Sequence, residues 1–155
     1  MENAFINVKN RSKTITAEVE IPQGGANGVL LAQGGRFGGW SLYLKDGKPT
    51  YMYNWIGLER YTVAASEPLA AGKAIIKLDF IYDGGGPGKG GAATLSINGK
   101  KAAEGRIPKT IANVISTDEG ADVGEDDDTP VSEDYVAGVK SRFTGKIDKV
   151  TVDVR

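Results

Sequence analysis

Residues 40–54 read WSLYLKDGKPTYMYN, two alternating runs that meet at Asp46-Gly47. Asp-Gly is a favoured two-residue hairpin turn because both positions tolerate positive φ. Such a turn would pair Trp40 with Tyr53, Leu42 with Tyr51 and Leu44 with Pro49. All of these groups then lie on one face, so the stretch predicts a β-hairpin with that face in the core. A three-residue turn would shift the pairing by one and lose this separation.

Similar strand signals recur along the rest of the chain. Apolar and polar residues alternate over residues 14–21 and through most of residues 73–83. Further strands are expected within residues 28–34, 92–107 (with a second hairpin turn at Asn98-Gly99) and 143–154. In the last of these, strict alternation would put Ile147 and Val150 on opposite faces. No segment has the spacing of a long amphipathic helix, so the predicted fold is all-β, an antiparallel β-sandwich.

Length and charge limit the classes of protein to consider. The chain has 155 residues, enough for one domain with a substantial core, and we expect a single domain over residues 1–155. Its formal net charge is −1, which offers no basic field to nucleic acid or to an anionic membrane. We see neither an apolar run long enough for a bilayer nor a signal segment. We therefore expect a soluble chain without nucleic-acid or membrane partners.

Two residue types are missing from the sequence, cysteine and histidine. Without cysteine there is no disulfide, thiolate nucleophile or cysteine metal site. Without histidine, the most frequent general base and the usual catalytic triads are also excluded. We therefore expect this chain to have no enzyme activity by itself.

The hairpin also contains candidates for a ligand-binding surface. Most of its aromatic residues are assigned to the core by the pairing above. The exceptions fall on the opposite face or at strand ends, and they are Arg36, Tyr43, Trp55 and Arg60. Exposed aromatic rings beside polar groups are typical of sugar-binding surfaces.

An acidic segment, TDEGADVGEDDDTPVSED, occupies residues 117–134. We expect a long loop with one short strand near residues 121–124. Glu119, Asp122 and Glu125 are three apart, so neighbours would face opposite sides of a strand, which argues against a glycosidase carboxylate pair. Two alternatives stay open, a solvated acidic loop, which is favoured, and a calcium site. The candidate calcium ligands are Asp118, Asp122, Asp126, Asp128 and Asp134.

The glycine-rich run DGGGPGKGG at residues 83–91 superficially resembles a phosphate-binding loop. Such loops need Ser or Thr after the lysine and a helix to follow, whereas here Gly90 and the strand-like run AATLSI follow. We interpret residues 83–91 as a hairpin loop.

Several motifs carry a resemblance to known families. The run FTGKIDKVTVDV at residues 143–154, preceded by DVGEDDD, resembles the last strands of concanavalin A-like, laminin-G-like jelly rolls. More narrowly, GGRFGGWSLY at residues 34–43 and TPVSEDY at residues 129–135 resemble the carboxy-terminal accessory domain of long bacterial arylsulfatases. This likeness runs from about residue 7 to residue 154.

The resemblance implies a jelly-roll domain of a longer bacterial arylsulfatase, a sulfuric ester hydrolase. Such a domain would be non-catalytic and would pack on the catalytic domain, stabilise it or shape its substrate cleft. The alternative is an independent carbohydrate-binding module that uses Trp55, Tyr43 and Arg36, with calcium in the acidic loop. The exposed side chains distinguish the two hypotheses. A binding module needs an aromatic face that is open to solvent, whereas a packing domain has a broad apolar patch.

Overall fold

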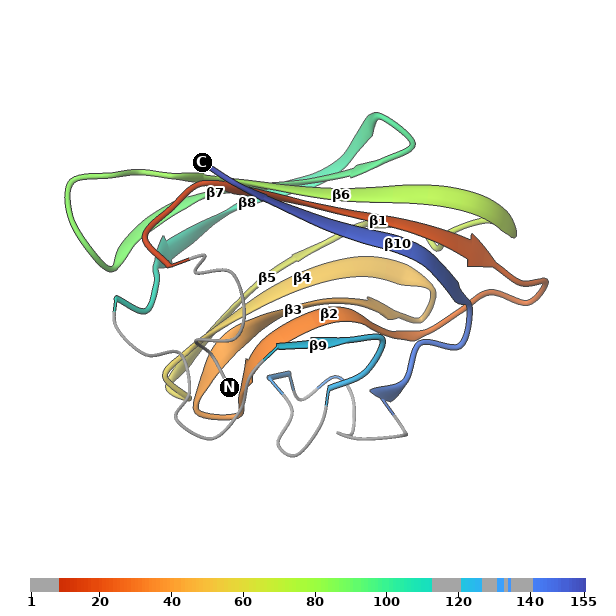
Figure 1. The fold of residues 1–155 in the computed structure, drawn as a ribbon, viewed down its shortest axis with the longest axis horizontal. Coiled ribbons are helices and arrows are strands. Elements are labelled where there is room, and N and C mark those ends of the chain that lie inside the picture. The colour runs from red at the N-terminus through yellow and green to blue at the C-terminus, as the bar shows by residue number, and fades with distance from the viewer. Residues whose placement is uncertain (1–8, 113–120, 127–130, 133, 135–140) are drawn as a thin grey trace.

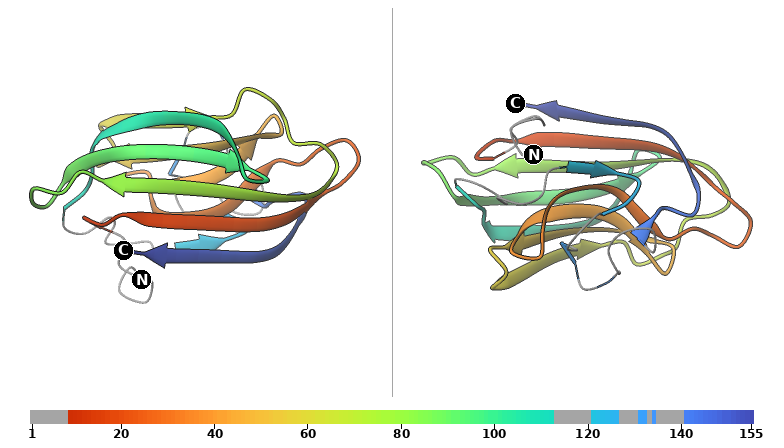
Figure 2. Two further views of the ribbon diagram at one scale, coloured as in Figure 1. Left: turned by 90° about the horizontal axis from the view of Figure 1, so that it is seen from above. Right: turned by 60° about the horizontal axis from the view of Figure 1, so that its bottom comes forward.

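The computed structural model describes residues 9–112, 121–126, 131–132, 134 and 141–155. Two five-stranded antiparallel sheets face each other, as the views in Figure 1 and Figure 2 show. Sheet A contains, in spatial order, β10 (Lys146–Val154), β1 (Lys13–Ile21), β6 (Gly72–Tyr82), β7 (Lys89–Ile97) and β8 (Lys100–Lys109). Sheet B contains β5 (Glu59–Ala64), β4 (Lys48–Trp55), β3 (Gly38–Lys45), β2 (Gly28–Gly35) and β9 (Ala121–Val123). The predicted antiparallel β-sandwich is confirmed.

The β3–β4 hairpin has the predicted register. Trp40 lies opposite Tyr53, Leu42 opposite Tyr51 and Leu44 opposite Pro49. Asp46 and Gly47 have φ of 53° and 76°, as a two-residue turn of this kind requires. Trp40 is 0% exposed, and its indole Nε1 donates to Gln33 Oε1 at 3.1 Å. The hairpin therefore buries a large aromatic ring and also satisfies its one polar group.

The core lies between the two sheets and follows the predicted alternation. Strand β1 contributes Ile15, Ala17, Val19 and Ile21, and β6 contributes Ala74, Ile76, Leu78 and Phe80. The residues that alternate with these, such as Ile75 and Ile81, face the outer side of sheet A, where both are about half exposed. Both strands are inner strands of sheet A, which is why their apolar faces are almost completely buried.

The expectation for the last strand is wrong in one respect. Ile147 and Val150 both pack against the core, although strict alternation would separate them. The pairing of β1 with β10 shifts by one residue, because Glu18 faces Lys149 while Val19 faces Ile147. Asp148 is the extra residue, and this β-bulge turns Ile147 to the same side as Val150.

A second bulge interrupts the β7–β8 hairpin close to its Asn98-Gly99 turn. Ser96 faces Lys101, but the next pair is Leu95 with Ala103, so Ala102 is the extra residue. Beyond the bulge, the side chains of β8 that face the core are those of the odd-numbered residues, Ala103 and Ile107 among them.

The edge strands of sheet B were only partly foreseen. The short strand expected near residues 121–124 is present as β9 and pairs with β2. Strand β5 was not predicted, although Tyr61 and Val63 alternate there and pack on the core. None of the described residues belongs to a helix with the length and apolar character that crossing a bilayer requires.

Lys13 is a buried cation at the start of β1. It is 3% exposed, and its Nζ lies 4.2 Å from the ring centroid of Trp40, 5.7 Å from that of Tyr51 and 5.8 Å from that of Phe80. The adjoining cavity, of about 10 Å³, is the size of one water molecule. Burial lowers the pKa of Lys13 to about 7. The aromatic faces stabilise the cation only in part, since cation–π contacts contribute about 2 kcal/mol when desolvated.

We predict that Trp40→Ala lowers the free energy of unfolding by about 3–5 kcal/mol, because it removes a fully buried aromatic ring. Urea unfolding of the variant and the parent chain measures this difference. A loss below about 1 kcal/mol with an intact fold would contradict the burial of Trp40.

We predict that Lys13→Met removes a pH dependence of stability. The folded-state pKa of Lys13 is below its ordinary value of 10.5, so the unfolded chain binds the extra proton between those two values. The free energy of unfolding contributed by Lys13 therefore falls as pH decreases from about 10 to about 7. Urea titrations at pH 7, 8 and 9 should show the Met variant to be more stable, most of all at pH 7. A difference in the free energy of unfolding between the two proteins that is equal at all three pH values would contradict the depressed pKa.

Candidate functional site

Four connecting segments lie at one end of the sandwich, on the left in Figure 1. They are the β2–β3 loop, the β4–β5 loop, the β6–β7 loop and the chain after β8. An ideal Cβ placed on Gly57, in the β4–β5 loop, would lie 3.3 Å from the carbonyl oxygen of Arg36. The first two loops are therefore in direct contact.

Asn54 fixes this contact from the end of β4. Its Nδ2 donates to the carbonyl oxygens of Arg36 and Val131, both at 2.9 Å, and more weakly to that of Gly35 at 3.4 Å. Its Oδ1 accepts from the backbone N–H of Gly57 at 2.9 Å. One fully buried amide thus joins both loops to a distant part of the chain.

Tyr43 does not lie on an open surface, so that expectation is wrong. It is on the face of sheet B away from the core, as predicted, but only 1% of it is exposed. That face has its own small cluster, in which Tyr43 packs with Val29, Met52 and Val131. The Tyr43 hydroxyl lies 2.5 Å from Asp134 Oδ2. Later segments of the chain cover this face, which leaves Tyr43 with a structural role.

Arg36 and Arg60 lie apart from Trp55. Arg36 is exposed in the β2–β3 loop, with its guanidinium 5.2 Å from the ring of Phe37. Arg60 is directly opposite Asn54, so both point to the outer side of sheet B. Trp55 is the next residue of β4 and points to the other side, toward sheet A. The four predicted ligand residues therefore do not form one site.

Trp55 lines an open hollow of about 430 Å³ between the ends of the two sheets. We call this the Trp55 hollow, and its other lining residues are Ile56, Gly88, Lys109, Thr110, Ile111 and Ala112. Trp55 is half-buried, so part of its ring packs on the core and part is accessible. The hollow thus combines an aromatic surface with polar groups from β8 and the segment after it.

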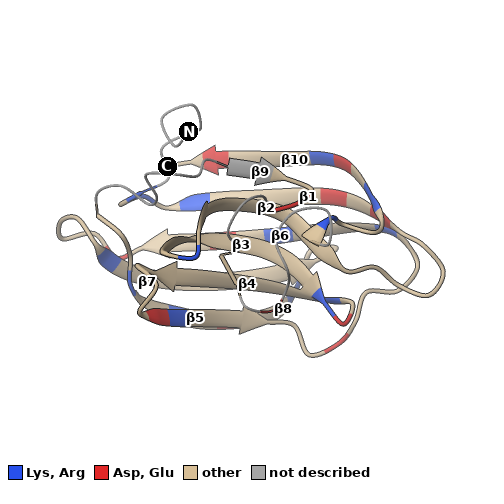
Figure 3. Ribbon diagram, turned by 90° about the horizontal axis from the view of Figure 1, so that it is seen from below, with Lys and Arg blue, Asp and Glu red and all other residues tan. Residues whose placement is uncertain are grey.

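A fixed cation lies beside this ring. Lys109 Nζ is 3.9 Å from the centroid of the Trp55 ring and 3.0 Å from Glu59 Oε1. Glu59 is opposite Trp55 at the start of β5. The red and blue bands at the start of β5 in Figure 3 agree with its first two residues, Glu59 and Arg60. The other oxygen of Glu59 accepts a hydrogen bond from the Tyr61 hydroxyl. Sequence reasoning missed Lys109 because its neighbours come from the opposite sheet.

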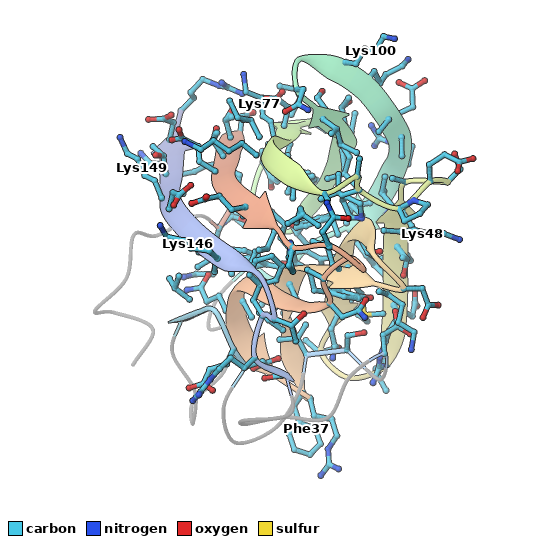
Figure 4. All side chains as sticks on the ribbon, turned by 90° about the vertical axis from the view of Figure 1, so that its right-hand side faces the viewer. Phe37, Lys48, Lys77, Lys100, Lys146 and Lys149 are labelled. Atoms are coloured by element: carbon cyan, nitrogen blue, oxygen red, sulfur yellow. The ribbon has the colours of Figure 1, made fainter. Side chains whose placement is uncertain are left out.

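Three apolar side chains project into solvent near the hollow. Phe37 is 65% exposed, Ile56 42% and Leu58 72%. Figure 4 shows Phe37 extending beyond the ribbon of sheet B. They come from the β2–β3 and β4–β5 loops, and we call them the apolar rim.

The acidic residues named as calcium ligands are only partly within the described residues. Asp118, Asp128 and the side chain of Asp122 lie outside them. Asp126 is buried, and its Oδ2 accepts from the backbone N–H of Val131 at 2.9 Å. Within the described ranges, no three acidic side chains are grouped as metal ligands would be. Calcium binding stays a prediction.

Comparisons with known proteins agree on the fold. No family model and no curated protein sequence matches the chain. A carbohydrate-binding module, the CBM40 of the Ruminococcus gnavus IT-sialidase, bound to α2,6-sialyllactose, has a TM-score of 0.64 and 18% identity, over 94% of this chain and 78% of that one. Mouse laminin α1 domains LG4-5 have a TM-score of 0.61 and 13% identity, over 97% of this chain and 38% of that one. The leech intramolecular trans-sialidase has a TM-score of 0.58 and 15% identity, over 93% of this chain and 21% of that one.

These likenesses show a jelly-roll sandwich of the concanavalin A-like, laminin-G-like kind, as the sequence motifs predicted. They give no support to a relation with arylsulfatases.

We predict that Asn54→Ala lowers the free energy of unfolding by about 2–3 kcal/mol, because buried backbone groups lose their partner. Thr62→Ala, at an exposed position of the neighbouring strand β5, is the control and should change it by less than about 0.5 kcal/mol. Thermal or urea unfolding measures both. Equal effects of the two substitutions would contradict the linking role of Asn54.

Proposed function

We propose that this chain is a non-catalytic carbohydrate-binding domain whose ligand contacts the Trp55 hollow. The observation that carries the proposal is the half-buried Trp55 ring at the edge of an open hollow, next to Lys109 and Glu59. Sugar rings have apolar faces and polar edges, so an aromatic surface with flanking polar groups suits them. The sialyllactose-bound module with the same fold supports this class of ligand.

The hollow also has the stability that a binding site needs. The Tyr53 hydroxyl accepts a hydrogen bond from the backbone N–H of Ile111 at 2.9 Å. The backbone N–H of Thr110 donates to the carbonyl oxygen of Gly88 at 3.2 Å. The chain after β8 is therefore held to both sheets before a ligand arrives. Such preorganisation reduces the entropy lost on binding.

Binding is favoured over catalysis on chemical grounds. The whole sequence lacks cysteine and histidine. Glycoside hydrolysis needs two carboxyl groups across the scissile bond. Among the described side chains at the hollow, Glu59 is the carboxylate, and it is engaged by Lys109 and Tyr61.

A second candidate function is supported by the apolar rim. Phe37, Ile56 and Leu58 form the kind of exposed apolar surface that a neighbouring domain covers. The chain would then stabilise a larger protein by packing on it. That the larger protein is an arylsulfatase is supported by the resemblance of residues 34–43 and 129–135 alone.

We predict that a glycan array carrying neutral and acidic glycans identifies ligands for the pure chain, and that Trp55→Ala weakens the best of them at least about tenfold. Titration calorimetry measures the affinity of both proteins, because Trp55→Ala removes the accessible tryptophan that would report binding by fluorescence. Titrations with calcium and with EDTA test the predicted calcium dependence.

Phe37→Ala is the matched control, an exposed aromatic residue outside the hollow, and it should keep the parental affinity. An array without any bound glycan would reject the binding function and favour the packing domain. Equal losses for the two variants would place the ligand on the apolar rim instead.

A further inference from the structure

Two lysines face each other at the mouth of the Trp55 hollow. Lys89 is directly opposite Lys109 at the end of the β7–β8 ladder. Directly opposed residues point to the same side of a sheet, and Lys109 points toward Trp55. Lys89 therefore also emerges on the side of sheet A that faces the hollow. Like charges in this position repel, so the pair costs stability in the absence of a counter-charge.

The neighbouring acids neutralise only part of this charge. Glu59 pairs with Lys109 and is held by Tyr61. Asp83, in the β6–β7 loop, is bound by the guanidinium of Arg106 at 2.5 and 3.0 Å. Arg106 is opposite Ala92, three positions along the ladder from the lysine pair, and this odd spacing places the ion pair on the outer side of sheet A. Within the described ranges, Lys89 makes no ion pair, and one positive charge at the mouth is left over.

The backbone of Lys89 is fixed from both sides. Its N–H donates to the Tyr82 hydroxyl at 2.9 Å, and its carbonyl oxygen accepts from Thr110 Oγ1 at 2.6 Å. Thr110 itself lines the hollow. The base of the Lys89 side chain is therefore held next to the hollow rather than on a mobile loop.

We infer that the Trp55 hollow takes acidic saccharides, with the carboxylate or sulfate group held by Lys89 and Lys109 and the sugar ring against Trp55 and Ile56. This inference rests on the proposed carbohydrate-binding function. A charged group in the ligand would remove the repulsion between the lysines, which gives binding energy that a neutral sugar cannot supply. Glu59 sets the limit of this preference, since it competes with the ligand for Lys109.

Three sugars with a common core test the inference, namely lactose, 3′-sialyllactose and 3′-sulfolactose. At low salt, titration calorimetry should show at least one acidic sugar binding about tenfold more tightly than lactose, and added salt should reduce that preference. A preference for sialyllactose alone would assign a carboxylate ligand, and a preference for sulfolactose alone a sulfate ligand.

Substitutions separate the site from a general effect of charge. Lys89→Gln and Lys109→Gln should each reduce the preference for the acidic sugar at least about fivefold, while Glu59→Gln should increase it. Lys77→Gln is the matched control, because Lys77 is an exposed lysine of β6 on the outer side of sheet A (Figure 4) and does not line the hollow, and it should leave the preference unchanged. Circular dichroism of each variant confirms that it is folded.

The outcomes distinguish the inference from the function on which it rests. If lactose binds as tightly as both acidic sugars, or if Lys77→Gln has the same effect as Lys89→Gln, the inference is overturned and the binding function remains. If the glycan array shows no bound glycan of either kind, both are overturned.

Discussion

The fold depends on the burial of Trp40, whose ring is fully buried and whose indole N–H therefore needs a partner. Gln33 from β2 supplies that partner, and the side chain of Lys13 from sheet A lies over the ring. These contacts connect both sheets through one side chain. Because the β3–β4 pairing sets the direction of every side chain in the hairpin, the same register that buries Trp40 also points Trp55 toward sheet A at the end of β4.

The outer face of sheet B is partly covered by later segments of the chain. In many sandwiches one sheet face is open, but here Val131 and Ser132 are buried against it, and Tyr43 bonds to Ser132 and Asp134. Asn54 closes the same face at its end. The accessible aromatic surface is therefore shifted from the sheet to the end loops. There the two sheets separate far enough to leave the Trp55 hollow.

Local patterns in the sequence predicted the strands and the hairpin register well, because period-two alternation and Asp-Gly turns act over a few residues. The sequence failed where distant segments meet. Tyr43 is assigned correctly to the outer face, but its burial depends on residues about ninety positions later. In the sequence Lys13 is an ordinary polar residue at the start of a strand, and only the side chains of the opposite sheet bury it. Lys109 and Glu59 likewise come from different sheets.

The bulge at Ala102 has an effect at the far end of β8. If Ala102 paired regularly with Leu95 instead of forming the bulge, every later residue of β8 would shift by one position, so Pro108 would lie opposite Lys89 and Lys109 would turn to the outer side of sheet A. The charge at the mouth of the hollow is therefore encoded beside a hairpin turn on the other side of the molecule. Deletion of Ala102 would leave Lys109 opposite Lys89 in a regular ladder, because the bulge accommodates that one residue. A residue added to this hairpin without a second bulge would instead turn Lys109 away from the hollow and remove its charge from the mouth.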